Sequence, residues 1–388
     1  MIPYGRQKIL PQDIDAVVNV LKSDFLSQGP MVPEFENAVA NYCQSQYAIA
    51  MNSATSALHC ACMALDIKPN DIIWTTPITF VASANCARYC NAEVDFVDID
   101  SKTYNISIAA LEKKLEIAAS LSKLPKIVIP VHLAGQSSDM KAIHSLSLKY
   151  GFRIIEDASH AIGGYYQNAP IGNCQYSDIT IFSFHPVKII TTGEGGMATT
   201  NDIHLAKRLA RLRAHGITRD VNDMLNPPDG PWYFQQLELG YNYKMTDVEA
   251  ALGLSQMKQL NENIKKRHAI AKKYNEWLTG LPIQLPWQHP DTYSAMHLYI
   301  IRLEKNYKLE HKKIFESLRN FGIGVNLHYV PVYRHPYYAA FGYALEDFPE
   351  SESYYASAIT LPLYPDLTED QQKQTVQALK KAMGFSNY

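Results

Sequence analysis

Three short segments combine residue types that could bind a phosphate, balance a cation and supply a reactive amine. The first is residues 52–57, Asn-Ser-Ala-Thr-Ser-Ala, at the expected start of a helix. Free N–H groups near Thr55 and Ser56 would face outward at the positive end of the helix dipole, which suits a phosphate. An ordinary helix N-cap explains the same residues. The segment lacks the glycines of a Walker loop or a dinucleotide-binding fingerprint.

The second segment is an acidic pair, Glu156 and Asp157, at the end of an apolar run, with His160 close behind. One carboxylate must point into a ligand crevice or into a layer of helices. A buried Asp needs a cationic partner to stay ionised, and a protonated pyridine nitrogen would be such a partner. An Asp that caps the following turn is the alternative.

The third segment places Lys188 just after an aromatic run, with Ser183 five residues earlier and a glycine-rich stretch at residues 193–196. A desolvated lysine could form a Schiff base, whereas a lone lysine is usually a solvated surface charge. Phosphate cradle, ring-nitrogen carboxylate and nucleophilic lysine, in this order, are what pyridoxal phosphate needs. Asp157 and Lys188 are 31 residues apart, one strand–helix excursion, so they can lie on neighbouring strand ends.

Alternating strands and helices between about residues 45 and 215 must position these groups. Continuously apolar runs predict strands covered on both faces, and their alternation with helices predicts a largely parallel sheet. Ligands bind such sheets at the carboxyl ends of the strands. The expected strands are 47–51, 71–75, 94–99, 126–132, 153–157, 179–184 and 197–199, and the expected helices are 55–65, 80–90, 108–119, 140–150 and 205–215.

The remaining chain predicts a connector and a second domain. Residues 217–240 are rich in turn formers and too long for a passive loop, and a long helix should run from an N-cap at Thr246 to about Leu278. Strands at 297–303 and 325–329 and helices at 309–321 and 369–383 suggest a small α+β domain. We therefore expect a large domain at 1–245, a linking helix at 246–281 and a small domain at 282–388.

Composition excludes several functional classes. The 388 residues carry 36 Lys and Arg against 38 Asp and Glu, so the basic excess of a nucleic-acid binder is missing. No stretch approaches the roughly 20 apolar residues of a membrane span, and the N-terminus lacks the long apolar run of a signal peptide. Six cysteines without a C-x-x-C pair argue against a disulfide scaffold and against a zinc site. We expect a cytoplasmic protein without a metal.

These motifs in this order resemble the DegT-type sugar-nucleotide aminotransferases, a pyridoxal-phosphate-dependent branch of the aspartate aminotransferase fold (fold-type I). The resemblance covers nearly the whole chain. Residues 4–7, 183–188 and 231–234 are most similar to the branch that acts in pseudaminic acid biosynthesis. The motifs that carry the family resemblance are residues 27–30, 52–58, 76–80, 156–161, 183–188, 194–196, 239–247 and 328–333.

The resemblance implies a role for each matching position. Lys188 would hold the cofactor and move the proton, Asp157 would contact the ring nitrogen, and His160 would lie beside the phenolic oxygen. Phe80 would stack on the ring, and Asn242 would reach the phosphate from the partner subunit of a homodimer. Thr55, Ser56 and Ser183 would contact the phosphate, and Tyr4, Arg6, His215, His328 and Tyr333 are weaker candidates for the sugar-nucleotide site.

The resemblance also implies the reaction, an amino transfer from L-glutamate to C-4 of a UDP-4-keto sugar. Related sugar dehydratases carry a histidine at the lysine position, so Lys188 favours transamination. Three alternatives remain: a dehydratase, a non-catalytic regulatory relative, and a transaminase for a D-configured keto sugar of the bacillosamine type. Packing or turn roles remain alternatives for Phe80, His160, Asn242 and the tyrosines.

Overall fold

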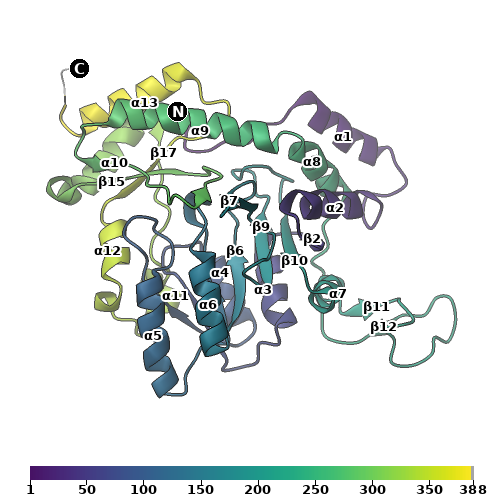
Figure 1. The fold of residues 1–388 in the computed structure, drawn as a ribbon. Coiled ribbons are helices and arrows are strands. Elements are labelled where there is room, and N and C mark those ends of the chain that lie inside the picture. The colour runs from purple at the N-terminus through teal and green to yellow at the C-terminus, as the bar shows by residue number, and fades with distance from the viewer. Residues whose placement is uncertain (386–388) are drawn as a thin grey trace.

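The computed structural model describes residues 1–385, and its centre is a seven-stranded sheet in the order β2-β10-β9-β6-β5-β3-β4 (Figure 1). β10 is antiparallel to both of its neighbours, and the strands from β9 to β4 are parallel. This confirms the predicted, mostly parallel sheet. Its strands are β2 (Tyr47–Met51), β3 (Ile72–Thr75), β4 (Glu93–Phe96), β5 (Ile127–Ile129), β6 (Arg153–Asp157), β9 (Ile179–Ser183) and β10 (Gly196–Thr200).

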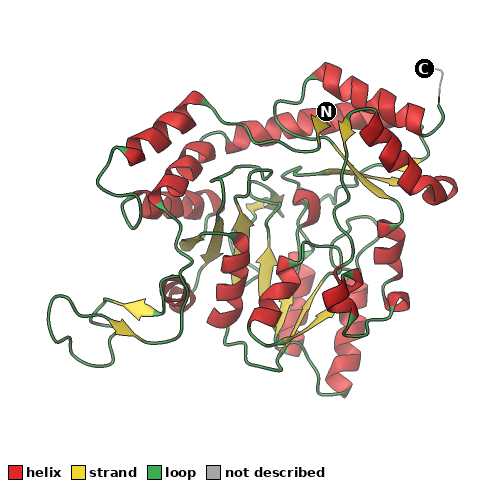
Figure 2. Cartoon of the chain, turned by 180° about the vertical axis from the view of Figure 1, so that it is seen from behind, coloured by secondary structure: helices red, strands yellow, loops and turns green. Residues whose placement is uncertain are grey.

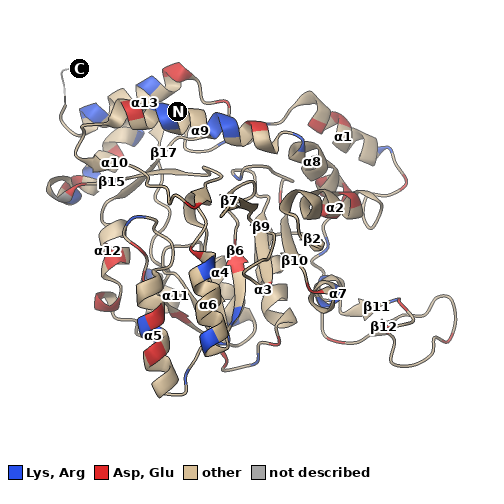
Figure 3. Ribbon diagram, in the orientation of Figure 1, with Lys and Arg blue, Asp and Glu red and all other residues tan. Residues whose placement is uncertain are grey.

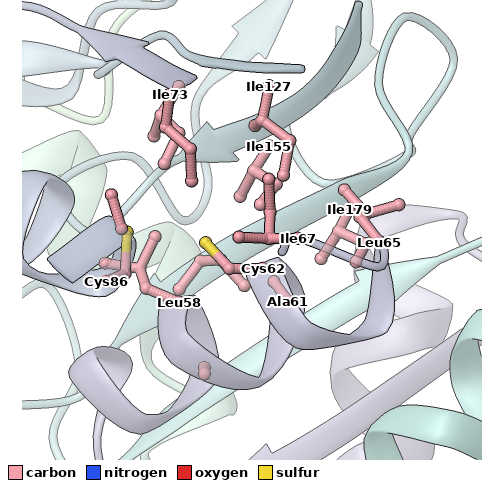
Figure 4. Close-up of a cluster of buried hydrophobic side chains, with 14 of the residues drawn as sticks. Leu58, Ala61, Cys62, Leu65, Ile67, Ile73, Cys86, Ile127, Ile155 and Ile179 are labelled. Carbon is pink, nitrogen blue, oxygen red and sulfur yellow. The ribbon is translucent and has the colours of Figure 1, made fainter. Parts of the chain in front are cut away.

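Helices cover both faces of the sheet because successive strand residues point to opposite sides. One face packs on α3 (Ala54–Ala64), α4 (Ala82–Tyr89) and α7 (Ile203–Leu212). Figure 4 shows Leu58 and Cys62 of α3 against Ile127 and Ile155 of this face. The other face packs on α5 (Ile108–Ser120), α6 (Met140–Tyr150) and α2 (Met31–Cys43). The sheet is therefore buried on both sides, as its apolar strands predict.

The C-terminal region forms a second layered unit that includes the start of the chain. The two-residue strand β1 (Ile2–Pro3) pairs in parallel with β16 (Ile323–Gly324), and α1 (Pro11–Leu21) packs on α8. The unit also contains the antiparallel sheet β13-β15-β17. Its elements are α8 (Asp247–Met257), α9 (Leu260–Leu278), β13 (Ile283–Gln284), β15 (Tyr299–Leu303), α10 (His311–Asn320), α12 (Pro349–Tyr355), β17 (Ala358–Leu361) and α13 (Glu369–Ala382).

Two predictions in this region were wrong. The expected single helix from Thr246 to Leu278 is two helices, α8 and α9, because Lys258 and Gln259 bond to carbonyls three residues back and interrupt the α-helical ladder. Neither proline nor glycine marks this break. The expected strand at 325–329 is absent: apart from an isolated bridge between Asn326 and Thr360, these residues form no ladder, and they line a cavity instead.

The connector at residues 217–240 forms an arm that projects from the body (Figures 1 and 2). Its base is a two-stranded ladder of β11 (Ile217–Thr218) and β12 (Gln235–Gln236). Figure 3 shows both signs of charge on the outer helices α5, α9 and α13. Within residues 1–385, no helix is long and apolar enough to cross a bilayer. The smaller elements are β7 (Tyr165–Tyr166), β8 (Ala169–Pro170), β14 (Thr292–Tyr293) and α11 (Pro336–Ala339).

Candidate active site

A cavity of about 500 Å³ lies where β6 and β9 end, at the carboxyl edge of the sheet. Most of its lining comes from the start of α3, the two strand ends with the loops that follow, and residues 326–329 of the C-terminal region. It is also lined by Tyr4, Thr79, Phe80, Ala82, Val131 and His297. A larger groove of about 650 Å³ follows the edge strand β4 and contains none of the predicted site residues. The chemistry-bearing side chains therefore gather in the smaller cavity.

The acidic pair at the end of β6 is divided between the two faces of the sheet. Asp157 lines the cavity and is buried, with Oδ2 accepting a 2.6 Å hydrogen bond from Ser83 Oγ and Oδ1 accepting one of 3.1 Å from the N–H of Ser159. Glu156 points the other way and pairs with buried His132, whose Nε2 lies 2.7 Å from Oε2. Alternation along the strand thus leaves Asp157 as the carboxylate available to a ligand.

Lys188 lies in the loop after β9 and lines the same cavity. The loop is held by hydrogen bonds from the N–H of Lys188 to the carbonyl of His185 and from the N–H of Thr192 to the carbonyl of Phe184. Burial lowers the pKa of the Lys188 amine to about 8, and the charge of Asp157 partly offsets this. About 9% of the amine is therefore neutral, and so nucleophilic, at pH 7, far more than for a lysine with the ordinary pKa.

The start of α3 forms the third wall of the cavity. Ser53 is the N-cap and accepts a 3.1 Å hydrogen bond from the N–H of Ser56, while Ala54 and Thr55 line the cavity. Gly196 lies against this turn so closely that an added Cβ would be 2.4 Å from Ala54 N. Because the first turn of a helix leaves N–H groups without intrahelical partners, this wall suits an anion.

Three buried imidazoles face Lys188 from the other side. Burial, reinforced by the charge of Lys188, lowers the pKa of His160 well below its usual value and that of His328 to about 3. Burial does the same to the pKa of His297, whose ring centroid is 4.5 Å from that of His160. All three rings are therefore neutral at physiological pH, and the charged side chains that line the cavity are Lys188, Asp157 and Glu194.

The structure brings most of the predicted site residues together but not all of them. Ser56 turns its hydroxyl to Asn52 Oδ1 at 2.6 Å and does not line the cavity. Tyr333 is packed in the core, where its hydroxyl donates to Glu352 at 2.8 Å. The residues that do line the cavity are Tyr4, Thr55, Phe80, Asp157, His160, Ser183, Lys188 and His328.

Three further predicted residues lie outside the cavity of their own chain. Arg6 and His215 are exposed and do not line it. Asn242 is exposed too, with its Oδ1 accepting a 2.7 Å hydrogen bond from Lys244 Nζ. The resemblance assigned Asn242 to a partner subunit, so its distance from this cavity does not test that role.

Several cavity residues carried no signal in the sequence. Ser83 of α4 donates a hydrogen bond to Asp157 but stands 74 positions away along the chain. His297, Asn326 and Tyr329 come from the C-terminal region and line the cavity through tertiary packing. Only the family motif at 328–333 could have drawn attention to Tyr329.

Comparison with known proteins gives a consistent result. The model of the DegT/DnrJ/EryC1/StrS aminotransferase family matches residues 7–380. A UDP-4-amino-4,6-dideoxy-N-acetyl-beta-L-altrosamine transaminase of Campylobacter jejuni is 37% identical over 95% of this chain and 93% of the relative. A UDP-4-amino-4-deoxy-L-arabinose–oxoglutarate aminotransferase of Shewanella sediminis is 33% identical over 99% of this chain and 98% of the relative.

Solved structures agree with this assignment. Helicobacter pylori PseC, an aminotransferase involved in the biosynthesis of pseudoaminic acid, has a TM-score of 0.89 and 30% identity, with 98% of each chain covered. A sugar aminotransferase, Spr1654 of Streptococcus pneumoniae, is described in its pyridoxal phosphate form, and it has a TM-score of 0.88 and 27% identity with 98% of each chain covered. Pyridoxal phosphate is the cofactor of this fold.

The cavity fits that cofactor by its own chemistry. It offers an amine with a lowered pKa at Lys188, a buried carboxylate at Asp157, and a helix start against which Gly196 leaves no room for a Cβ. An aldehyde, a protonated ring nitrogen and a phosphate are the groups these three features suit. The chain is a pyridoxal-phosphate-dependent sugar aminotransferase, and it belongs to the DegT/DnrJ/EryC1/StrS aminotransferase family.

Proposed function

We propose that this enzyme transfers the amino group of L-glutamate to C-4 of a UDP-linked 4-keto-6-deoxy-N-acetylhexosamine, giving UDP-4-amino-4,6-dideoxy-N-acetyl-β-L-altrosamine in pseudaminic acid biosynthesis. The observation that carries this proposal is the joint presence of Lys188 and Asp157 in one cavity of a chain 37% identical to the Campylobacter transaminase of that name. The overall likeness to Helicobacter PseC supports the same substrate.

Lys188 and Asp157 divide the chemical work in this proposal. When bound, pyridoxal phosphate supplies an aldehyde that takes up the amino group and a ring that accepts electrons. Lys188 anchors the cofactor, and once released it moves a proton between the reacting carbons as general base and then general acid. Asp157, held by Ser83 and by the N–H of Ser159, keeps the ring nitrogen protonated.

The other cavity residues position the cofactor and the sugar. Thr55 and the first turn of α3 bind the phosphate together with Ser183, and Phe80, which lines the cavity and is 57% exposed, stacks on the ring. Tyr4 and His328 face the sugar from the C-terminal side, with ring centroids 5.1 Å apart. Their neutral, hydrogen-bonding rings suit hydroxyl groups of a sugar.

A second candidate substrate is another UDP-4-keto sugar. The relative from Shewanella is named for 4-amino-4-deoxy-L-arabinose at 33% identity, so the family relationship alone leaves the sugar open. Facial selectivity at C-4 depends on how the sugar is placed against the cofactor, and a small displacement changes the product.

The deciding experiment incubates the holoenzyme with glutamate and, separately, the L-configured 4-keto-6-deoxy-N-acetylhexosamine linked to UDP, its D-configured epimer, and UDP-4-keto-L-arabinose. NMR of the product identifies the amino sugar. We expect at least a tenfold preference in kcat/KM for the first substrate, and no turnover by Lys188→Ala. A preference for either other sugar overturns the substrate assignment, and loss of a hydroxyl in place of amine gain identifies a dehydratase.

We further propose that the enzyme is a homodimer whose arm contacts the partner. The arm, residues 217–240, projects from the body (Figure 2). It exposes large apolar side chains, including Trp232 at 77% exposure and Leu225 at 80%. Apolar side chains on a projecting segment favour a protein partner. Asn242 lies beside the base of the arm, so a partner that receives the arm also receives this residue.

Light scattering of the double variant Trp232→Ser/Leu225→Ser tests the dimer. We expect the mass of a dimer for the unmodified protein and a shift toward the monomer for the variant. Leu148→Ser is the matched control, because Leu148 on α6 is 75% exposed and lies away from the arm. An unchanged mass in the arm variant would remove the arm from the interface.

A further inference from the structure

The resemblance places His160 beside the cofactor's phenolic oxygen, and the fold directs the hydrogen bonds of this ring to other protein groups. The N–H of Ala134 donates to His160 Nδ1 at 3.3 Å. A ring nitrogen that accepts a hydrogen bond carries a lone pair, so the proton of the neutral imidazole is on Nε2. Nε2 lies 3.1 Å from the hydroxyl oxygen of Tyr329 and donates to it. The ring N–H of the histidine expected beside the cofactor's phenolic oxygen thus donates to a tyrosine.

The hydroxyl of Tyr329 accepts this hydrogen bond and can donate another. Its oxygen accepts from His160, so its own proton is free to point to another acceptor, and the described residues provide none for it. Tyr329 lines the cavity with Lys188 and Asp157, and its ring centroid is 6.2 Å from that of Phe80. The proton is therefore available to an acceptor on a ligand in the cavity.

A rigid turn fixes the direction of the chain from Ala134 to Tyr329. Ala134 has a positive φ of 58°, and Gly135 has a φ of 100° with an added Cβ only 3.0 Å from His160 O. The same turn is tied to the C-terminal region by hydrogen bonds from the N–H of Ala295 to the carbonyl of Gly135 and from the N–H of His297 to the carbonyl of Ala134. His160 is packed between this turn and the ring of His297.

We propose that Tyr329 donates a hydrogen bond to the phenolic oxygen of the bound cofactor, and that His160 is a positioning residue behind it. This inference deepens the proposed function, because it concerns the same cavity, but it requires only the cofactor and no particular sugar. A neutral donor suits this role. Burial, and then the negative charge of Asp157, raise the pKa of Tyr329, so the phenol keeps its proton.

The charged and titratable groups around Tyr329 come from every wall of the cavity. Lys188 and Asp157 face it from the strand ends, His160 from the loop after β6, and His328 and Tyr4 from the C-terminal side. The imidazoles of His160 and His328 are neutral, and the other charged or titratable groups that line the cavity are Lys188, Asp157, Glu194 and His185. Replacing Tyr329 by phenylalanine removes the hydroxyl and leaves these charges in place.

The test is the pH dependence of the visible absorbance of the holoenzyme, in which pyridoxal phosphate is bound to Lys188. A hydrogen-bond donor to the phenolic oxygen stabilises the deprotonated form of the bound cofactor. In that form the shared proton has left, and the negative charge on the oxygen is no longer compensated. Tyr329→Phe should therefore raise the spectral midpoint by about one pH unit, as expected for a hydrogen bond to a charged group. An unchanged midpoint would overturn the proposal.

Variants of His160 separate positioning from direct contact. His160→Gln keeps an acceptor for Ala134 and a donor for Tyr329, so its midpoint should remain near that of the unmodified enzyme. His160→Leu should shift the midpoint in the direction of Tyr329→Phe, and the double variant should shift it no further. Additive shifts would mean that His160 contacts the phenolic oxygen itself. Tyr176→Phe, a tyrosine outside the cavity, is the matched control for loss of a hydroxyl.

Half-reactions distinguish the cofactor from the sugar as the acceptor. If Tyr329 served only the sugar, Tyr329→Phe would leave both the spectral midpoint and the reaction with glutamate unchanged and would slow only the step with the keto sugar. That result contradicts the inference. Failure of the enzyme to accept the proposed sugar would overturn the proposed function but would leave the spectral result intact.

Discussion

The lowered pKa of Lys188 makes a quantitative prediction for capture of the cofactor by the apoenzyme. With a pKa of about 8 in place of the ordinary 10.5, about 9% of the amine is neutral at pH 7, against about 0.03% for an exposed lysine. The neutral amine is the form that attacks an aldehyde. At equal intrinsic reactivity, Lys188 should therefore react about 300-fold faster than a solvated lysine at pH 7.

The perturbation is pH, and the assay is stopped-flow absorbance after mixing apoenzyme with pyridoxal phosphate. Between pH 7 and pH 9 the rate constant should rise about tenfold and then level off, because titration of an amine with a pKa of about 8 is nearly complete at pH 9. A lysine with the ordinary pKa would show a rise of about 100-fold without a plateau. N-acetyl-lysine, measured in parallel, corrects for ionisation of the aldehyde itself.

The variant Asp157→Asn tests in which direction the charge of Asp157 shifts the pKa of Lys188. The carboxylate raises the pKa of Lys188 and works against burial, so its removal should move the midpoint of the rate profile below 8. A midpoint near 10.5 in the unmodified enzyme would refute the desolvation argument. A midpoint that rises in Asp157→Asn would refute the placement of the carboxylate beside the amine.

Three further predictions test the framework of the site. Gly196→Ala should weaken cofactor binding at least tenfold in a fluorescence titration, because the added Cβ would be 2.4 Å from Ala54 N. Gly5→Ala is the control: its Cβ would meet Val187 at an ordinary 3.7 Å, so binding should be unchanged. Glu156→Ala should destabilise the fold by about 3 kcal/mol in urea unfolding, because it leaves Nε2 of buried His132 without its partner, whereas loss of the exposed Glu316 should cost less than about 1 kcal/mol. Burial works to raise the pKa of Glu156, but the hydrogen bonds from His132, Ser177 and Thr180 hold this pKa below its usual 4.5. The stabilisation by this pair should therefore be complete above pH 4.5 and lost as the pH falls below it. Stability that stays constant down to about pH 2 would contradict the pairing.

Much of the architecture followed from local patterns in the sequence. The strands 47–51 and 153–157 and the helix 140–150 were predicted with the bounds they have, and the other sheet strands were found with ends displaced by a few residues. These elements could be predicted because apolar runs and helical periodicity reflect the backbone geometry of residues that are neighbours in the sequence. The break between α8 and α9 was missed because Lys258 and Gln259 are compatible with a continuous helix, so only packing decides it.

The candidate site divides in the same way. The acidic pair, the hydroxyl-rich start of α3 and Lys188 could be found from the sequence, because each follows a strand in a fold that gathers strand ends at one edge. Ser83 and His297 could not, since each reaches the cavity from a distant segment and neither carries a distinctive pattern, and for Tyr329 the only signal was the family motif at 328–333. Tyr333 belongs to the family motif at 328–333, but it packs in the core and does not line the cavity.

The sequence by itself determined which residues end the strands, and so which chemical groups can meet at the edge of the sheet. Only the tertiary structure decided that Asp157 faces the ligand while Glu156 pairs behind the sheet, and that Ala134 turns the donor of His160 toward Tyr329. The physical reason is the range of the forces involved. Backbone sterics and side-chain periodicity act between neighbours in the chain, whereas facing, burial and hydrogen-bond direction depend on residues that meet only after the layers have packed.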